Sequence, residues 1–381
     1  MGILSVNTNE HLYHVVKNNV LKDFNDYKTT KLNPDISCIV DGTAKKILFI
    51  RDVGLGDILM TLPTVCQLKK IYPNSVITYA SKLVYHELLR LYTFIDKLED
   101  VLSIDERLKY YDVVHDLRNK LENYRERKNQ RHRVDSIAEV CDIKLSSKTI
   151  SMNIPSQSVT KVKKLLEKNN VPQQKKLIGI VSRGTFRLRS WPLDYVIRLC
   201  LLSNENSDLH YILLSNDRDY GFDLPNVLDL TGKLSLVDLA AVVKRCDAVI
   251  SSDTGTLHMA GALDVPVIGI FGSIPPEIRT MYYKKCYNLS ASGKIDCSPC
   301  FDRQFGDRQA VYRCLHMDTK CMRRIKPEDV YERLKYILFK EDKAICDFCG
   351  AYDLYFYKGY GKKLTVCNHC GRQIARSDNG D

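Results

Sequence analysis

The sequence places a run of small polar side chains, Ser251-Ser252-Asp253-Thr254-Gly255-Thr256, between two apolar segments, with His258 two residues further on. Residues 248–250 and 265–271 predict buried strands, and a helix is predicted to start near Ala260. Such a strand–turn–helix directs backbone N–H groups at an anion, so phosphate is the ligand to expect, and a sugar nucleotide carries two. Asp253 either caps the helix or binds a sugar or ribose hydroxyl, and Thr254 to Thr256 supply donors. His258 either reaches the same site or is buried with one hydrogen bond.

A second candidate is Gly54-Leu55-Gly56-Asp57, which follows a predicted strand at residues 46–50. Apolar residues then recur at helical spacing as far as Ile71, and the glycines permit a sharp turn between strand and helix. Asp57 is interpreted either as a helix cap, a position that Asp fills well, or as a general base that takes the proton of an attacking hydroxyl.

Basic and hydroxyl residues gather in a third segment, residues 182–192, again between a predicted strand and a predicted helix. Arg187 and Arg189 are suited to hold a diphosphate, because guanidinium groups bind phosphate oxygens in a bidentate fork. The alternative is a basic loop anchored by Trp191, the single Trp of the chain, for which we expect packing.

Fourteen cysteines are present, and nine of them fall in the last quarter of the chain. In a reducing compartment, clustered cysteine pairs point to a metal before disulfides. Cys346 and Cys349 form one Cys-x-x-Cys-Gly knuckle and Cys367 and Cys370 another, on either side of a predicted strand hairpin at residues 351–366. This spacing predicts a structural zinc ribbon with four thiolate ligands, in which the metal supplies the fold because about forty residues cannot build a sufficient core.

A second metal site is suggested by a less regular set of cysteines, Cys297, Cys300, Cys314 and Cys321. Cys286 and His316 are substitute ligands for this set. Zinc or an iron–sulfur centre suits such ligands, and free buried thiols or redox-sensitive pairs are the alternatives.

Alternating strand and helix patterns predict an α/β fold with two doubly wound parallel sheets, whose carboxyl ends line one cleft. We expect an extension at residues 1–44, a first Rossmann-like domain at 45–165, a second at 166–340 and the zinc ribbon at 341–381. The boundary between the two domains is placed in the Lys-rich helical stretch at residues 155–176. Residues 101–104 and 113–115 are predicted as short strands of the first sheet.

A formal net charge of +11 is concentrated locally, since residues 161–189 carry nine Lys or Arg against one Glu and residues 118–133 are also basic. Such segments suit phosphate ligands, an acidic glycan, an anionic membrane surface or nucleic acid, or are solvated helix faces. No run of eighteen apolar residues predicts a membrane span, and the N-terminus has no secretory pattern. We therefore expect a cytoplasmic protein, with peripheral contact to the inner face of the membrane as a further option.

In their order, these motifs resemble glycosyltransferase family 9, the ADP-heptose:lipopolysaccharide heptosyltransferase family, over residues 46–338. The resemblance is carried by Leu55-Gly56-Asp57-Ile58-Leu59 through Leu62-Pro63, Ser190-Trp191-Pro192, Leu230-Thr231-Gly232-Lys233 with Leu236 and Asp238-Leu239-Ala240, Ser252-Asp253-Thr254-Gly255 through His258-Met259-Ala260, and Pro266 through Phe271-Gly272-Ser273. It implies a GT-B architecture with the acceptor on the first domain and the sugar nucleotide on the second. It also implies inversion at the anomeric carbon without a catalytic metal.

The resemblance makes Asp57 the candidate base, and we expect Gly56 and Arg118 on the acceptor side. The expected donor-binding residues are Thr185, Arg187, Arg189, Asn216, Leu236, Asp253, Thr254, Gly255, Thr256 and His258. We expect an inverting transferase that moves a heptose or related sugar from a nucleoside-diphosphate sugar to a hydroxyl of a lipopolysaccharide-type or other surface glycan.

The zinc ribbon and the N-terminal extension depart from the family pattern. They keep open an enzyme that glycosylates nucleic acid or protein through the ribbon, and a non-catalytic nucleic-acid-binding protein. A further rival, another Rossmann enzyme such as a sugar-nucleotide epimerase, would need a third glycine after Gly54-Leu55-Gly56.

Overall fold

A computed structural model of the chain describes residues 45–118, 131–184, 186–203, 208–215, 221–300, 314, 316 and 318–339, and the backbone of three strands between residues 354 and 374. Residues Thr43–Asp381 form one compact unit. The predicted extension at residues 1–44 lies outside the described residues.

A four-stranded parallel sheet forms the first half of the unit, with the strand order β3-β2-β1-β4. Its strands are β1 (Lys46–Ile50), β2 (Val76–Ser81), β3 (Lys97–Asp100) and β4 (Val113–Asp116). Its helices include α2 (Leu55–Ile71), α3 (His86–Leu89) and α5 (Arg133–Val140). The last four residues of β1 are fully buried, as expected of a parallel strand that is covered on both faces.

A six-stranded parallel sheet forms the second half, with the order β10-β9-β8-β5-β6-β7. Its strands are β5 (Lys176–Val181), β6 (Leu209–Leu213), β7 (Val227–Asp229), β8 (Ala248–Ser252), β9 (Val267–Phe271) and β10 (Leu289–Ser290). Its helices include α7 (Leu193–Leu202), α8 (Leu236–Arg245), α9 (Gly255–Ala262), α10 (Glu277–Thr280), α11 (Lys320–Arg324) and α12 (Pro327–Phe339). In this order β6 and β7 follow β5 on one side, and β8, β9 and β10 follow on the other side. This is the strand order of a doubly wound nucleotide-binding sheet, which confirms the predicted fold class.

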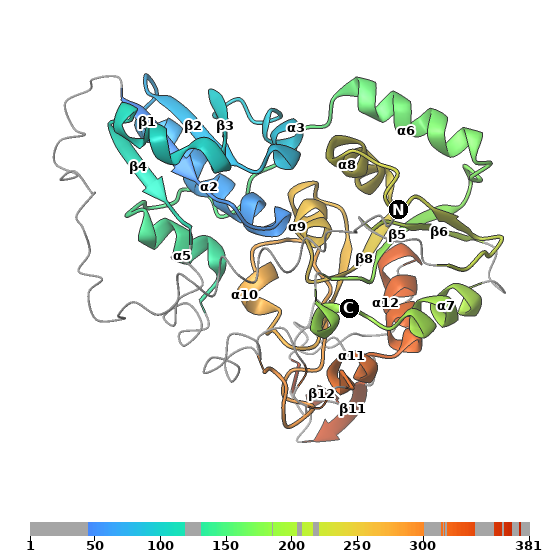
Figure 1. Ribbon diagram of the computed structural model, residues 1–381. Coiled ribbons are helices and arrows are strands. Elements are labelled where there is room, and N and C mark those ends of the chain that lie inside the picture. Colours follow the sequence, from blue (N-terminus) through green and yellow to red (C-terminus); the bar gives the residue numbers. More distant parts are fainter. Residues whose placement is uncertain are drawn as a thin grey trace, which may run out of the picture. The chain divides into compact units, whose positions relative to one another are not determined.

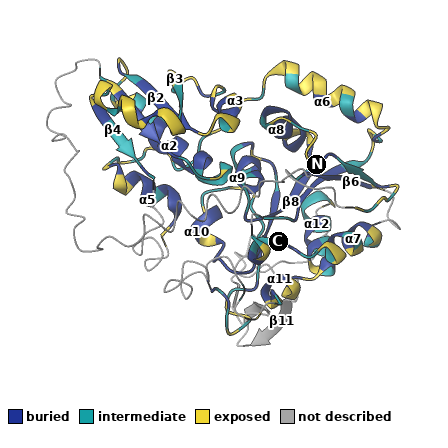
Figure 2. Ribbon diagram, viewed as in Figure 1, coloured by how far each residue is buried: buried dark blue, intermediate teal, exposed yellow. Residues whose placement is uncertain are grey.

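Helix α6 (Ser156–Lys168) connects the two sheets and buries only Val162 and Leu166, so most of its surface is exposed (Figure 2). The predicted domain boundary falls at this helix and stays a prediction. The core of the second half includes Trp191, which is 1% exposed and donates from Nε1 to the Ile325 carbonyl at 3.0 Å. The expectation that Trp191 packs is confirmed.

Two predicted element assignments were wrong. Residues 101–104 are not a strand, because the Asp100 carboxylate accepts a hydrogen bond from the Leu102 N–H at 3.1 Å and turns the chain into a 3-10 helix, η3 (Val101–Ser103). The strand is the preceding polar segment, β3. Helix α9 begins at Gly255 rather than near Ala260, because the extended backbone of Thr254 leads directly into it.

The predicted C-terminal hairpin is confirmed as β11 (Leu354–Gly359) paired antiparallel with β12 (Lys362–Cys367), and β13 (Gln373–Ile374) adds a third strand. Cys367 closes β12 opposite Leu354. Cys346, Cys349 and Cys370 lie outside the described residues. Across the described part of the chain, no helix is both long and apolar enough to cross a membrane.

Candidate active site

The candidate residues come directly after the strands at which the chain changes direction across each sheet and begins to add strands on the other side. In the first sheet the reversal lies between β1 and β4, and Gly54 to Asp57 follow β1. In the second sheet it lies between β5 and β8, and residues 182–190 follow β5 while Asp253 and the start of α9 follow β8. Ligands of doubly wound sheets bind at such reversals, beyond the carboxyl ends of the strands.

The N-terminal turns of α2 and α9 pack directly against each other (Figure 1). A Cβ atom added to Gly56 would lie 2.6 Å from Cδ2 of His258, and one added to Gly255 would lie 2.7 Å from Cβ of Leu55. Glycine is therefore required at both positions, because a side chain would hold the two turns apart. The helix that carries Asp57 and the helix that carries the predicted donor site meet at their N-terminal ends.

Asp57 lies in the first turn of α2 and is paired with buried arginines. The cap position belongs to Gly54, so the interpretation of Asp57 as the cap is wrong. Arg133 of α5 donates to Oδ1 of Asp57, and Arg51, which directly follows β1, lies 3.8 Å from the same oxygen. Burial raises the pKa of Asp57, but the positive charges of Arg133, Arg51 and Arg279 outweigh it and leave that pKa below its ordinary value.

Asp253 is buried among three cationic or ionisable side chains. Its Oδ2 lies 3.3 Å from Nη1 of Arg189 and 3.8 Å from Nε of Arg279, and its Oδ1 lies 3.7 Å from Nε2 of His258. Burial raises the pKa of Asp253, and these neighbours more than offset it, so that the pKa lies well below the ordinary value. His258 is itself held by Tyr283, whose hydroxyl lies 2.9 Å from Nδ1.

Arg279, Arg133 and Arg51 are site residues that the sequence motifs did not reveal. Arg279 lies on α10, is 3% exposed, and acts electrostatically on both Asp57 and Asp253. It follows the end of β9, next to β8 in the sheet, and that place in the strand order is the signal that would have found it. Arg133 gave no local signal, because it reaches Asp57 from 76 residues away.

The other predicted donor residues surround the start of α9 to different degrees. Thr254 has the extended backbone of a helix cap, and its hydroxyl lies 3.0 Å from that of Ser251. Thr256 is 7% exposed in the first turn, where the backbone N–H groups of a helix have no partner within the helix. Arg187, in the 3-10 helix η5 (Arg187–Arg189), is exposed, and its guanidinium makes no ion pair with another described residue. Leu236 is the half-buried first residue of α8, and Thr185 and Asn216 lie outside the described residues.

Arg118, predicted on the acceptor side, follows β4 and is bound by two carboxylates. It donates to Asp116 at 2.6 Å and to Asp105 at 2.6 Å. The hydrogen bonds that it donates to these two carboxylates raise its pKa. Its guanidinium is thus already engaged at the carboxyl end of the first sheet.

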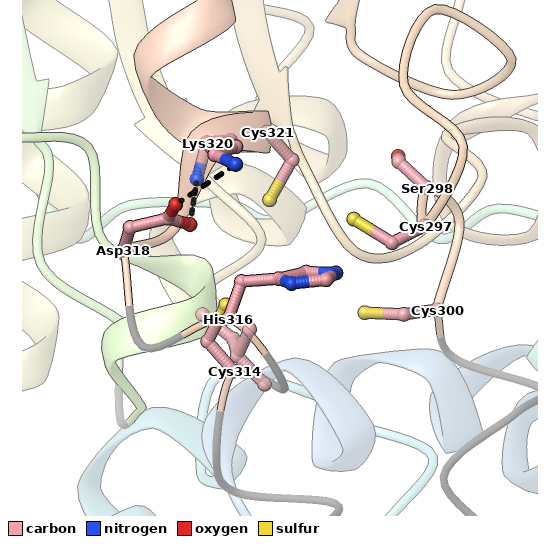
Figure 3. A pocket seen from close by; sticks show the side chains of 9 residues that line it. Cys297, Ser298, Cys300, Cys314, His316, Asp318, Lys320 and Cys321 are labelled. Atoms are coloured by element: carbon pink, nitrogen blue, oxygen red, sulfur yellow. Dashed lines mark hydrogen bonds and ion pairs between the residues drawn. The ribbon is translucent and has the colours of Figure 1, made fainter.

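Four cysteines of the second predicted metal set line one pocket. Cys297, Cys300, Cys314 and Cys321 share it with His316, and their sulfur atoms face the space beside the imidazole ring (Figure 3). Leu188 of η5 also lines it, so the pocket adjoins the segment that carries Arg187 and Arg189. Burial raises the pKa of the Cys321 thiol to about 12, and the neighbouring cysteines add to that effect.

The donor types in this pocket suit a thiolate metal site, but their positions do not form one. No three or more His, Cys, Asp or Glu side chains in the described part of the chain are placed to hold a metal ion together. The cysteines whose side chains the structure describes, including Cys286, are free thiols.

Two parallel doubly wound sheets, with the N-terminal turns of α2 and α9 in contact, define a doubly wound α/β fold. The profile of glycosyltransferase family 9 (heptosyltransferase) matches residues 117–308, which is half of the chain. The chain therefore belongs to glycosyltransferase family 9.

Curated relatives are similar at low identity. Lipooligosaccharide heptosyltransferase 2 of Campylobacter jejuni is 22% identical over 285 residues, which cover 71% of this chain and 84% of that protein. Lipopolysaccharide heptosyltransferase 1 of Pseudomonas aeruginosa is 28% identical over 116 residues, and the match spans 28% of this chain and 31% of that enzyme.

Solved structures share the fold. A family 9 glycosyltransferase of Veillonella parvula has a TM-score of 0.61 at 17% identity and covers 78% of this chain and 98% of its own. ADP-heptose lps heptosyltransferase II of Escherichia coli has a TM-score of 0.54 at 16% identity, with coverage of 78% and 99%. The iron-containing dodecameric glycosyltransferase TibC of E. coli has a TM-score of 0.60 at 14% identity, with coverage of 77% and 79%.

Proposed function

We propose that the protein is an inverting glycosyltransferase that moves a heptose or related sugar from a nucleoside-diphosphate sugar to a hydroxyl of a lipopolysaccharide-type or other surface glycan. The observation that supports this most is the contact between the N-terminal turns of α2 and α9, with Arg279 acting on both Asp57 and Asp253. The family match and the names of the relatives favour heptosyl transfer over the rival Rossmann enzyme.

On the donor side, the diphosphate would bind at the start of α9. The backbone N–H groups of its first turn and the positive end of the helix dipole attract an anion. Arg189 and Arg279 add positive charge at the same place, and Asp253 holds both guanidinium groups there. These groups would stabilise the negative charge that grows on the departing nucleoside diphosphate.

On the acceptor side, Asp57 would accept the proton of the attacking hydroxyl. The acceptor oxygen forms a bond to C1 of the sugar while the bond from C1 to the phosphate oxygen breaks on the opposite face, which inverts C1 once. The nucleoside diphosphate leaves with the electron pair of that bond. Because its pKa lies below the ordinary value, Asp57 is a carboxylate at neutral pH and ready to take the proton as the new bond forms.

We propose that the diphosphate departs without a catalytic metal, since two arginines and a helix end supply the positive charge. The chain does contain an Asp-x-Asp triplet, Asp217-Arg218-Asp219, a pattern able to bind Mg²⁺. It lies outside the described residues. Chelation with EDTA tests this part of the proposal, and activity that needs added Mg²⁺ or Mn²⁺ would overturn it.

The proposal is tested by transfer from ADP-heptose and other sugar nucleotides to a heptose-acceptor glycan. TibC has been solved in complex with ADP-D-beta-D-heptose, which makes this the first donor to assay. We expect thermal stabilisation by one nucleoside diphosphate, since a ligand of the folded state shifts unfolding by mass action. NMR of the product should show an anomeric configuration opposite to that of the donor. Retention of configuration, or no transfer from any nucleotide sugar, would contradict the proposal.

For the cell, we propose a cytoplasmic enzyme that meets its glycolipid acceptor at the inner face of the membrane. Co-sedimentation with vesicles that contain the acceptor glycolipid tests this contact. Equal recovery in the supernatant with and without the acceptor would argue against it.

We also propose that the C-terminal segment binds a structural zinc through Cys346, Cys349, Cys367 and Cys370. The β11–β12 hairpin between the knuckles supports this, because it is the element that a zinc ribbon contains. One zinc per chain in the purified protein, lost on Cys346→Ser and Cys367→Ser substitution, is the expected result. No zinc in protein prepared without chelators would refute it.

The described positions of Cys297, Cys300, Cys314 and Cys321 do not form a metal site, so the predicted second metal is tested by measuring the metal content of the protein. The donor set of their pocket suits zinc or iron, and the similar fold of iron-containing TibC makes iron worth measuring. Elemental analysis of a Cys300→Ser variant against wild type distinguishes this pocket from the ribbon. A wild-type metal content that the variant leaves unchanged would show that these thiols hold no metal.

A further inference from the structure

Asp57 uses only one of its two carboxylate oxygens for the ion pairs described above. Arg133 and Arg51 both approach Oδ1, and the described residues place no partner on Oδ2. The side chain of Asp57 is 25% exposed, whereas those of Arg133 and Arg51 are 10% and 0% exposed. The carboxylate is therefore held through Oδ1 by buried arginines, while the Asp57 side chain as a whole keeps partial access to solvent.

Arg133 is held in place by the helix on which it lies. It is the first residue of α5, and the imidazole Nδ1 of His132 caps this helix by accepting from the Val134 N–H at 3.2 Å. Helix α5 packs against α2, so a short and rigid path connects Arg133 to Asp57. An arginine with this support loses little additional conformational freedom when it pairs.

We propose that Arg133 is a positioning residue for the transfer reaction. It clamps Oδ1 and thereby turns Oδ2 toward the acceptor hydroxyl. This inference rests on the proposed function, in which Asp57 is the base. Arg51 approaches Oδ1 only at 3.8 Å, so it contributes charge but does not fix the orientation of the carboxylate.

The same helix connects the clamp to the second half of the molecule. Two residues after Arg133, the Asp135 carboxylate accepts a hydrogen bond from the Tyr282 hydroxyl at 2.5 Å and pairs with Lys148. Tyr282 follows α10, which carries Arg279. The orientation of the base is therefore tied to the element whose arginine faces the donor site.

The test compares Arg133→Met and Arg133→Lys with a matched control, Arg131→Met. Arg131 lies two residues away, is 47% exposed and pairs with the exposed Glu139. We expect Arg133→Met to lower kcat about tenfold to a hundredfold, because a misplaced reacting group costs on this scale. The KM for the donor should stay within about twofold, and Arg131→Met should behave as wild type.

The pH profile separates positioning from a structural role. Loss of Arg133 removes a positive charge beside Asp57, so the acid limb of kcat against pH should move to higher pH in Arg133→Met. Arg133→Lys retains a charge but not the rigid fork, so it should lower kcat with a smaller movement of the limb. If Arg133→Met does not fold, as judged by circular dichroism, Arg133→Lys carries the test alone.

A double-mutant cycle with Asp57→Asn shows whether Arg133 acts through Asp57. In the Asp57→Asn background, Arg133→Met should produce no further loss of rate. An equal loss in both backgrounds, or a wild-type kcat and acid limb in Arg133→Met, would overturn the positioning role. Full activity of Asp57→Asn alone would instead refute the proposed function, so the two failures are distinguishable.

Discussion

Replacement of Asp253 by asparagine should destabilise the protein strongly. The Asp253 side chain is 7% exposed and is the carboxylate that Arg189 and Arg279 share at 3.3 and 3.8 Å. The Asp253→Asn substitution would leave those two guanidinium groups close together without the carboxylate that they share, and the Arg279 side chain is only 4% exposed. Removing one partner of a buried ion pair costs about 3–5 kcal/mol, and the partial exposure of Arg189 favours the lower end of that range.

The assay is thermal or urea unfolding of Asp253→Asn beside a matched control, Asp264→Asn. Asp264 pairs with Lys285 at 2.8 Å, but these side chains are 60% and 47% exposed. A surface pair of this kind is worth less than about 1 kcal/mol. A loss of about 3 kcal/mol should lower the Tm of Asp253→Asn by roughly 4 °C, because the unfolding entropy is about 2 cal/mol/K per residue.

The pH dependence of the unfolding free energy shows whether the ionised form of Asp253 is the one that stabilises the protein. Because folding lowers the pKa of Asp253, its ionised form stabilises the protein above the unfolded-state pKa of about 4. This contribution is lost as the pH falls through the folded-state pKa, so wild type and Asp253→Asn should converge in acid. Unfolding free energies within about 0.5 kcal/mol of each other at pH 7 would refute the reasoning, since surface substitutions already span that range.

Three further predictions concern the contacts between the two halves. Gly56→Ala would place a Cβ atom 2.6 Å from Cδ2 of His258, a residue that is only 2% exposed. Because this crowding would displace the two turns, turnover should fall at least about tenfold. Unchanged kinetics would disprove the close contact. Tyr282→Phe removes the bond to Asp135 and should lower the free energy of urea unfolding by about 1 kcal/mol, whereas a stabilised variant would contradict this. Burial lowers the pKa of His132 to about 4, so the stability of the wild type should rise from about pH 4 to 6.5 as the unfolded chain releases its proton. His132→Asn retains a capping side chain and should flatten that rise, and an unaltered slope would show that His132 is not its source.

The sequence was sufficient to predict the buried strands β1, β5 and β8 and to single out one carboxylate after β1 and one after β8. The apolar runs of β1, β5 and β8 are buried on both faces, so their pattern is plain, and each precedes a turn of small or polar residues. Asp57 and Asp253 were found because they follow such strands at short distance. The segment after β3 misled the assignment, because an apolar residue there, Leu102, is 87% exposed on a 3-10 turn rather than part of a strand.

The arginines of the site were not predictable in the same way. Arg133 and Arg279 reach the carboxylates from α5 and α10, and their roles depend on how the two sheets pack together. Local patterns carry no information about a contact between residues 76 positions apart. The close approach of Gly56 and His258 is of the same kind, since each residue belongs to a motif that was recognised separately.

The central claim is that Asp57 takes the acceptor proton while the start of α9 holds the donor. It is tested most directly by measuring donor affinity and transfer rate on the same Asp57→Asn protein. The account predicts a donor Kd within about twofold of wild type and a kcat lower by about a hundredfold or more, because only proton transfer is lost. A variant that transfers sugar at the wild-type rate would contradict it.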